Sequence, residues 1–131
     1  MARSATPFLM FEGSAEAAMT LYVSLFKNSA VTSVERYGAG GQGPEGSVKL
    51  AHFTVGGSPV MCIDSPVKHN FAFTPAVSVF VECEDEAEMD QAFGQLSKDG
   101  LVLMPPGNYG FSTKFTWVSD RFGVSWQLNL K

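Results

Sequence analysis

Six polar side chains fall on segments that otherwise have the composition of buried β-strands, and their types could do chemistry. They are Ser125, Gln127 and Asn129 near the C-terminus, Cys62 and Asp64 in the middle of the chain, and His52. Within the first two groups they lie two residues apart, so each group shares one face of a strand. Hydroxyl, amide and carboxylate groups on one face can orient a polar ligand. We therefore expect these six residues to line a cleft that binds a small molecule.

The same residues do not form a recognisable catalytic set. A general base needs a partner that orients it, and the sequence identifies none for His52, which could equally be a single polar residue on a half-buried strand. A reactive cysteine needs a neighbouring cation or helix N-terminus, whereas Cys62 lies in mid-strand and Cys83 lies among acidic residues. The glycines of 37–47 formally match G-x-G-x-x-G, but Pro44 follows instead of a helix, so no dinucleotide site is predicted.

The overall composition excludes several classes of protein. The chain has 131 residues, of which 45% are hydrophobic and 17% charged, as in a globular domain. A net charge of −4 without a run of lysine or arginine argues against nucleic acid or membrane partners. No segment reaches the ~18 apolar residues of a membrane span. Because signal-peptide features and a disulfide framework are also absent, we expect a cytoplasmic protein.

A repeat with an offset of 71 residues indicates how these segments are positioned. Helical i, i+3, i+4, i+7 spacing occurs twice in the chain, at Ala18, Leu21, Tyr22 and Leu25 and again at Met89, Ala92, Phe93 and Leu96. A residue suited to capping precedes each expected helix, namely Ser14 and Asp85. A short apolar run precedes each cap. The repeat therefore indicates the duplication of one strand–helix unit.

Both copies continue with three further β-rich segments. The expected strands are 8–11, 31–37, 48–55, 59–64, 75–81, 101–104, 111–119 and 124–130. They predict an α+β fold of two tandem βαβββ modules, about 7–64 and 75–131, joined by a linker over 65–74. One helix covers only one face of a four-stranded sheet. We therefore expect the modules to form a partly open eight-stranded barrel, with the helices outside and a central cleft inside, and with Phe80, Phe93 and Trp126 in the core.

Local runs make the chain resemble a known family. The most specific is Asp-Arg-Phe-Gly-Val-Ser-Trp-Gln at 120–127, and the runs at 7–13, 17–22, 43–48 and 75–81 support it. With the doubled βαβββ plan, they resemble the vicinal oxygen chelate superfamily of glyoxalase I, bleomycin-resistance proteins and extradiol dioxygenases. Within it they resemble the bacterial PhnB-like branch, commonly described as 3-demethylubiquinone-9 3-methyltransferase-like. The resemblance covers nearly the whole chain and implies a single glyoxalase-like domain and a homodimer.

The resemblance also implies four inward positions that hold a divalent metal in the superfamily's enzymes. They fall near Pro7, Cys62, Ser78 and Gln127. Proline has no donor, serine is a rare ligand, and Gln127 is neutral where the metal enzymes commonly have glutamate. Cys62 would be a soft ligand without its usual partners. We therefore expect neither a catalytic metal nor another cofactor.

Two functions of different class remain open. The first is a metal-independent binding protein of the bleomycin-resistance type, whose partner is a small molecule. The alternative is a cryptic glyoxalase- or dioxygenase-like enzyme that uses Cys62, Asp64, Gln127 or His52. The missing metal ligands favour the first. Methyl transfer is not favoured, because an adenosylmethionine site usually needs a strand-to-helix glycine loop at the edge of a parallel sheet.

Overall fold

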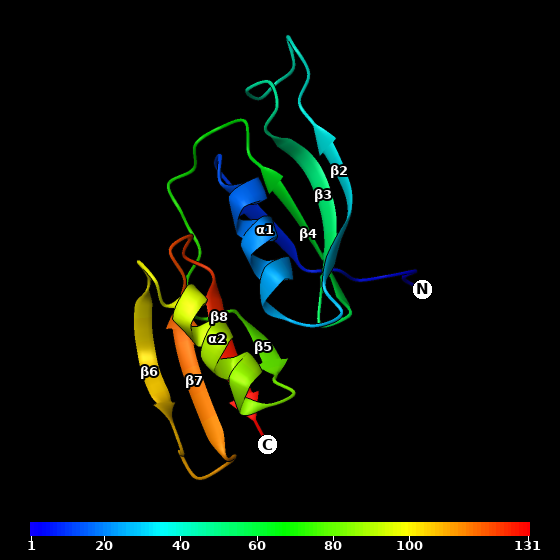
Figure 1. Ribbon diagram of the computed structural model, residues 1–131. Helices are drawn as coiled ribbons and strands as arrows, with labels where there is room; N and C mark the ends of the chain where they lie inside the picture. Colours follow the sequence, from blue (N-terminus) through cyan, green and yellow to red (C-terminus); the bar gives the residue numbers. More distant parts are fainter. The chain divides into compact units, whose positions relative to one another are not determined.

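The computed structural model describes all residues from 1 to 131, which divide into two compact units, Met1–His69 and Asn70–Lys131 (Figure 1). The division falls inside the segment 65–74. Each unit contains four strands and one helix in the order β-α-β-β-β. The α+β class and the two tandem modules are confirmed. The strands form two four-stranded mixed sheets rather than one closed barrel.

The elements of the two units correspond one to one. The first unit contains β1 (Phe8–Phe11), α1 (Ala15–Leu25), β2 (Ala30–Arg36), β3 (Val48–Val55) and β4 (Ser58–Asp64). The second contains β5 (Ser78–Glu82), α2 (Glu86–Leu96), β6 (Leu101–Gly107), β7 (Lys114–Ser119) and β8 (Ser125–Leu130). The strand orders are β1-β4-β3-β2 and β5-β8-β7-β6. The parallel pairs are β1 with β4 and β5 with β8, which are the first and last strands of each unit along the chain. All other pairs are antiparallel.

The bounds of the elements preserve the repeat seen in the sequence. Both ends of α1 and α2 differ by 71 residues, and so do both ends of β2 and β6. Beyond that point the copies diverge, because the loop over 37–47 is longer than its counterpart over 108–113. The constant offset of 71 residues therefore holds for the helix and the strand after it.

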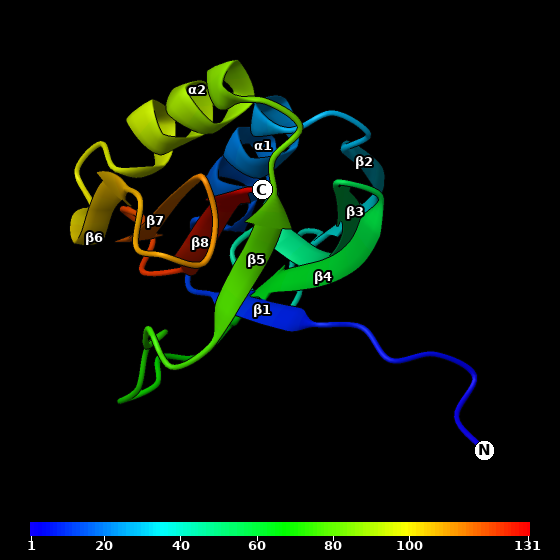
Figure 2. The same cartoon turned by 90° about the horizontal axis from the view of Figure 1, so that it is seen from below.

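Each helix covers one face of the sheet in its own unit (Figures 1 and 2). In the first unit Tyr22 of α1 is fully buried, and its ring centroid lies 6.4 Å from that of Phe53 on β3. In the second unit Met89 of α2 is fully buried, as are Trp126 and Leu128 on β8. The placement of Trp126 in the core is confirmed. Neither helix has the length and apolarity needed to cross a bilayer.

The turns follow from local sequence. Gly56 and Gly57 connect β3 to β4 with φ of 55° and 84°, the positive values that a two-residue type I′ hairpin requires. β6 extends further than the expected 101–104 and includes Pro105 and Pro106. Proline is compatible with this strand because β6 lies at the edge of its sheet.

Candidate functional site

Cys62 and Asp64 lie on the face of the first sheet that α1 covers. Cys62 is fully buried opposite Ala51, and Asp64 is only 3% exposed. His52 lies opposite Met61, one residue out of phase with Cys62, so it is on the other face of the sheet and is exposed. The structure therefore does not place these three residues together in an open cleft, contrary to the expectation from the sequence. Strand alternation predicts that Cys62 and Asp64 share a face, but not which face the helix covers.

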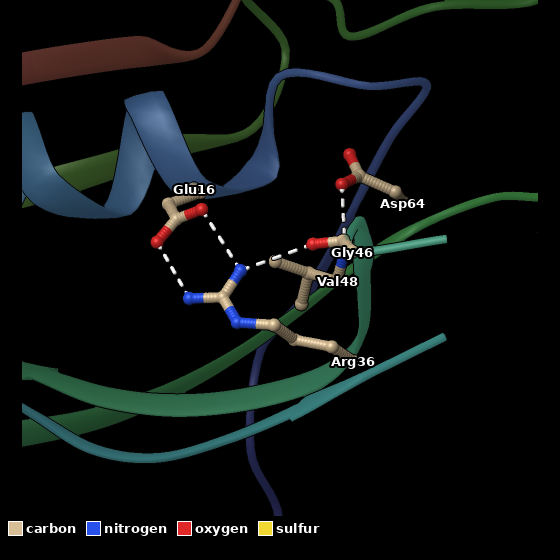
Figure 3. Close-up of polar contacts among 5 residues, drawn as sticks. All are labelled: Glu16, Arg36, Gly46, Val48 and Asp64. Atoms are coloured by element: carbon tan, nitrogen blue, oxygen red, sulfur yellow. Dashed lines mark hydrogen bonds and ion pairs between the residues drawn. The ribbon is translucent and has the colours of Figure 1, made fainter. Parts of the chain in front are cut away.

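Both oxygens of the Asp64 carboxylate accept backbone hydrogen bonds. Its Oδ1 accepts from the N–H groups of Gly13 and Ala15 at 2.8 and 2.9 Å. Its Oδ2 accepts from the N–H of Val48 at 3.0 Å (Figure 3). A carboxylate at the start of α1 is also favoured by the helix dipole. Asp64 thus ties the end of β4 to the starts of α1 and β3.

This arrangement corrects the expected cap of α1. The side chain of Ser14 caps no N–H of the helix. Asp64, which is distant in the sequence, instead accepts from the N–H of Ala15, the first residue of α1, and from that of Gly13 just before the helix. The cap of α2 is confirmed, because Asp85 Oδ1 accepts from the N–H of Glu88 at 2.8 Å and Glu88 Oε1 accepts from the N–H of Glu84 at 2.8 Å. In a capping box Glu88 would accept from the N–H of Asp85 itself, whereas here it reaches one residue further back, to Glu84.

The ends of the glycine-rich loop over 37–47 are anchored in the first unit. Arg36 donates two hydrogen bonds to the carboxylate of Glu16, at 2.9 and 2.7 Å, and a third to the carbonyl of Gly46 at 3.1 Å (Figure 3). The hydroxyl of Tyr37 donates to the carbonyl of Asp64 at 3.0 Å. A pocket of about 190 Å³ lies beside this loop. Its buried charged group is the carboxylate of Asp64, which already accepts three backbone hydrogen bonds, so we assign no ligand to the pocket.

Ser125, Gln127 and Asn129 are brought together on the face of the second sheet that α2 leaves uncovered. They alternate with the buried Trp126 and Leu128 of β8. Across the sheet they lie opposite one row of residues on β5 and another on β7: Ser78, Phe80 and Glu82, and Ser119, Trp117 and Phe115. We call Ser78, Glu82, Ser125, Gln127 and Asn129 the polar face.

One end of the polar face is a hydrogen-bonded network. The hydroxyls of Ser78 and Ser125 lie 2.6 Å apart. Ser125 Oγ also accepts from Trp117 Nε1 at 2.8 Å, and Ser78 Oγ accepts from Gln127 Nε2 at 3.2 Å. The network fixes these side chains, as a preformed binding site requires.

At the other end, Asn129 contacts Glu82. Asn129 Nδ2 donates to the two carboxylate oxygens of Glu82 at 3.3 and 3.1 Å. Asn129 is 6% exposed, and its Oδ1 accepts no hydrogen bond from the protein. Most buried polar atoms have a partner, so this oxygen is exceptional.

A cluster of aromatic rings borders this end of the polar face. Phe115 lies opposite Asn129, and its ring centroid is 6.4, 6.1 and 5.0 Å from those of Phe80, Tyr109 and Phe111. Phe80, Tyr109 and Phe111 are all exposed. The expectation that Phe80 belongs to the core is therefore wrong. Its place between Ser78 and Glu82 on β5 is the sequence signal that could have identified it, because alternate residues share a face.

Comparison with known proteins agrees with this fold. A family model described as 3-demethylubiquinone-9 3-methyltransferase matches residues 3–129. The chain belongs to this family. The structure of the PhnB protein from Bacillus cereus is 54% identical, with a TM-score of 0.94 over 98% of this chain and 100% of that one. Protein YjdN of Escherichia coli K12 is 24% identical over 95% of this chain and 93% of its own length.

A more distant structure shows how far the fold extends. The fosfomycin resistance protein FosX from Mesorhizobium loti is 11% identical, with a TM-score of 0.63 over 100% of this chain and 94% of that one. At this identity the likeness shows the fold alone. The resemblance to the PhnB-like, 3-demethylubiquinone-9 3-methyltransferase-like branch is confirmed.

The resemblance to the vicinal oxygen chelate superfamily implies a divalent metal, and the residues at the four implied positions do not fit one. Pro7 has no side-chain donor, and Cys62 lies under α1. Ser78 and Gln127 are neutral and hydrogen-bond to each other. No three His, Cys, Asp or Glu side chains are grouped so that they could hold a metal ion. That this protein works without a metal stays a prediction.

Neither cysteine is suited to nucleophilic chemistry. Both are free and buried. Burial raises the pKa of the Cys62 thiol to about 11, with a further contribution from Asp64. Burial raises the pKa of Cys83 to about 12, and the nearby carboxylates of Glu88 and Glu82 act in the same direction. A thiol with so high a pKa carries little thiolate near neutral pH.

Proposed function

We propose that this protein binds a small molecule on the polar face, as a metal-independent binding protein of the bleomycin-resistance type. One observation carries the proposal: hydroxyl, amide and carboxylate groups share one face of a sheet beside exposed aromatic rings. A binding site typically combines an apolar surface with a few placed polar groups. The poorly ionised cysteines and the unsuitable metal positions favour binding over catalysis.

The enzyme alternatives receive less support from the site. The family description names a methyl transfer, and a site for the methyl donor adenosylmethionine usually needs a glycine-rich loop between a strand and a helix. The two strand-to-helix turns of this chain are not glycine-rich. The turn from β1 to α1 contains Gly13 as its single glycine, and the turn from β5 to α2 contains none. A glyoxalase- or dioxygenase-type reaction would need a donor set for a metal, which Pro7, Ser78 and Gln127 do not provide.

We also propose a homodimer in the cytoplasm. All residues of β2 are exposed at the edge of the first sheet, and an unpaired edge favours association. Two free cysteines agree with a reducing compartment.

The binding proposal is tested by thermal-shift screening of a small-molecule library with matched variants. Compounds that stabilise the wild-type protein should stabilise Gln127→Ala much less. They should stabilise Gln91→Ala fully, because Gln91 is an exposed glutamine on α2, away from the polar face. A chelator should leave every thermal shift unchanged, because it removes only metal ions and the proposed binding involves none. Only a metal that binds the native state would contribute to its stability. Stabilisation that disappears with chelator and returns with metal would restore the enzyme alternative.

A further inference from the structure

The second sheet places a buried hydrogen-bond acceptor beside a carboxylate. Because Asn129 Nδ2 donates to Glu82, the orientation of the amide is fixed and Oδ1 is its other end. This oxygen is buried and accepts no hydrogen bond from the protein. An unpaired buried acceptor costs free energy. A ligand that brings a donor to it removes that cost.

The charge around this acceptor favours a cation. Glu82 forms no ion pair, and Arg36, Lys49 and Lys114 each pair with other carboxylates. Glu84 and Asp85 follow it in the chain, and the net charge of the protein is −4. The carboxylate of Glu82 and the Oδ1 of Asn129 are both acceptors. A neutral donor would form ordinary hydrogen bonds with them, whereas an ammonium group has three donors and forms the stronger, charge-assisted kind with the carboxylate.

The aromatic cluster supplies an apolar surface next to these acceptors. Phe115 lies opposite Asn129 in the sheet, and Gly107 lies opposite Phe115 on β6. The ring of Tyr109 packs beside Gly107, where a Cβ would lie 3.8 Å from its Cε2. Phe80 and Phe111 are more than half exposed, and exposed side chains change rotamer within nanoseconds. These exposed rings can therefore rearrange around a ligand beside Phe115, which lies opposite Asn129. Their faces attract both apolar rings and cations.

We propose that the ligand of the polar face is an aromatic amine in its protonated form. Its ammonium group donates to Asn129 Oδ1 and to the carboxylate of Glu82, and its ring packs on Phe80 and Phe115. This inference rests on the proposed binding function and specifies the class of ligand.

The experiment is a nuclear magnetic resonance titration of the ¹⁵N-labelled full chain with three probes of similar size. Phenethylamine carries a positive charge, 2-phenylethanol is neutral and phenylacetate is negative. Phenethylamine should shift the amide resonances of β5, β7 and β8 and the side-chain amide of Asn129. It should bind about tenfold more tightly than 2-phenylethanol, because hydrogen bonds between charged groups are the stronger ones. Phenylacetate should bind more weakly still.

Two variants that each remove one negative charge separate the role of Glu82 from the effect of net charge on binding. Glu82→Gln keeps the shape and an acceptor for Asn129, and it should lower the affinity for phenethylamine to that for 2-phenylethanol. Glu45→Gln removes an exposed charge from the loop over 37–47 and should leave the affinity unchanged. The amide spectrum of each free variant reports whether the fold is intact.

The outcomes distinguish this inference from the function on which it rests. Equal binding of phenethylamine and phenylacetate, or an unchanged affinity in Glu82→Gln, would overturn the preference for an amine. If 2-phenylethanol or phenylacetate still bound at β5 and β8, the proposed binding function would stand. If none of the three probes shifted resonances of this sheet at millimolar concentration, both would fall.

Discussion

Asp64 shows how one side chain can stabilise three separate segments. Its carboxylate is the acceptor for the backbone N–H groups of Gly13, Ala15 and Val48. Asp64→Ala leaves these groups without a partner, and we expect it to lower the free energy of unfolding by about 3 kcal/mol. Ser14→Ala is the control, because Ser14 caps no N–H of the helix, and it should change stability by less than about 0.5 kcal/mol. Urea unfolding followed by circular dichroism measures both. Equal losses would contradict the assignment of the cap to Asp64.

The buried cysteines make stability fall at alkaline pH. The ordinary pKa of a thiol is 9.0, and burial raises that of Cys62 to about 11 and that of Cys83 to about 12. Above pH 9 the unfolded chain loses thiol protons that the native state retains, so raising the pH favours unfolding. We expect the melting temperature to decline between pH 9 and 11. The decline should be smaller in Cys83→Ala, and an identical decline in that variant would show that other groups cause it.

At the scale of the elements, two glycines of the second unit should respond to alanine in opposite directions. A Cβ at Gly100, between α2 and β6, would clash with the backbone carbonyl of Ser119 and lie 3.1 Å from Cα of Asp120. Backbone atoms cannot move aside cheaply, so Gly100→Ala should destabilise the protein by about 1–3 kcal/mol. A Cβ at Gly94 in α2 would meet nothing within 4 Å. Gly94→Ala should therefore stabilise by up to about 1 kcal/mol. Thermal unfolding measures both, and destabilisation by both would contradict the packing.

The sequence predicts those elements whose causes are local. Helical spacing locates both helices, the glycine pair at 56–57 locates the hairpin, and Asp85 with Glu88 forms the cap of α2. The cap of α1 could not be predicted, because its acceptor is Asp64, which is remote in the chain. For the same reason alternation in β4 does not show which face lies under α1. That face depends on tertiary packing.

Of the candidate site, too, only the part with local causes could be predicted from the sequence. Alternation in β8 correctly grouped Ser125, Gln127 and Asn129 on one face. The partners of these residues could not be identified, because register between strands decides that Glu82 lies opposite Asn129. The cluster around Phe115 includes rings from the loop over 108–113. Loop conformation leaves no periodic signal in a sequence.

At the scale of the whole molecule, the proposed homodimer is a direct test of the exposed edge strand. The chain has a mass of 14.1 kDa. Sedimentation velocity at micromolar concentration should give a single species of about twice that mass, as expected for a twofold, isologous dimer. Val34 is exposed on β2, and the dimer of a Val34→Lys variant should dissociate more readily if β2 lies in the interface. A monomer in the wild-type protein would contradict the proposal.

The two caps give the duplicated modules different orders of folding. The cap of α2 comes from residues next to it, so this helix can start as soon as its own segment is available. The cap of α1 arrives only with the last strand of its unit, and closing so long a loop is slow. We expect pulsed hydrogen exchange during refolding to protect α2 before α1. During synthesis on the ribosome, α1 would lack its cap until β4 had been made. By contrast, α2 would form before the strands that follow it. Two descendants of one ancestral module would thus reach the same architecture by opposite sequences of events.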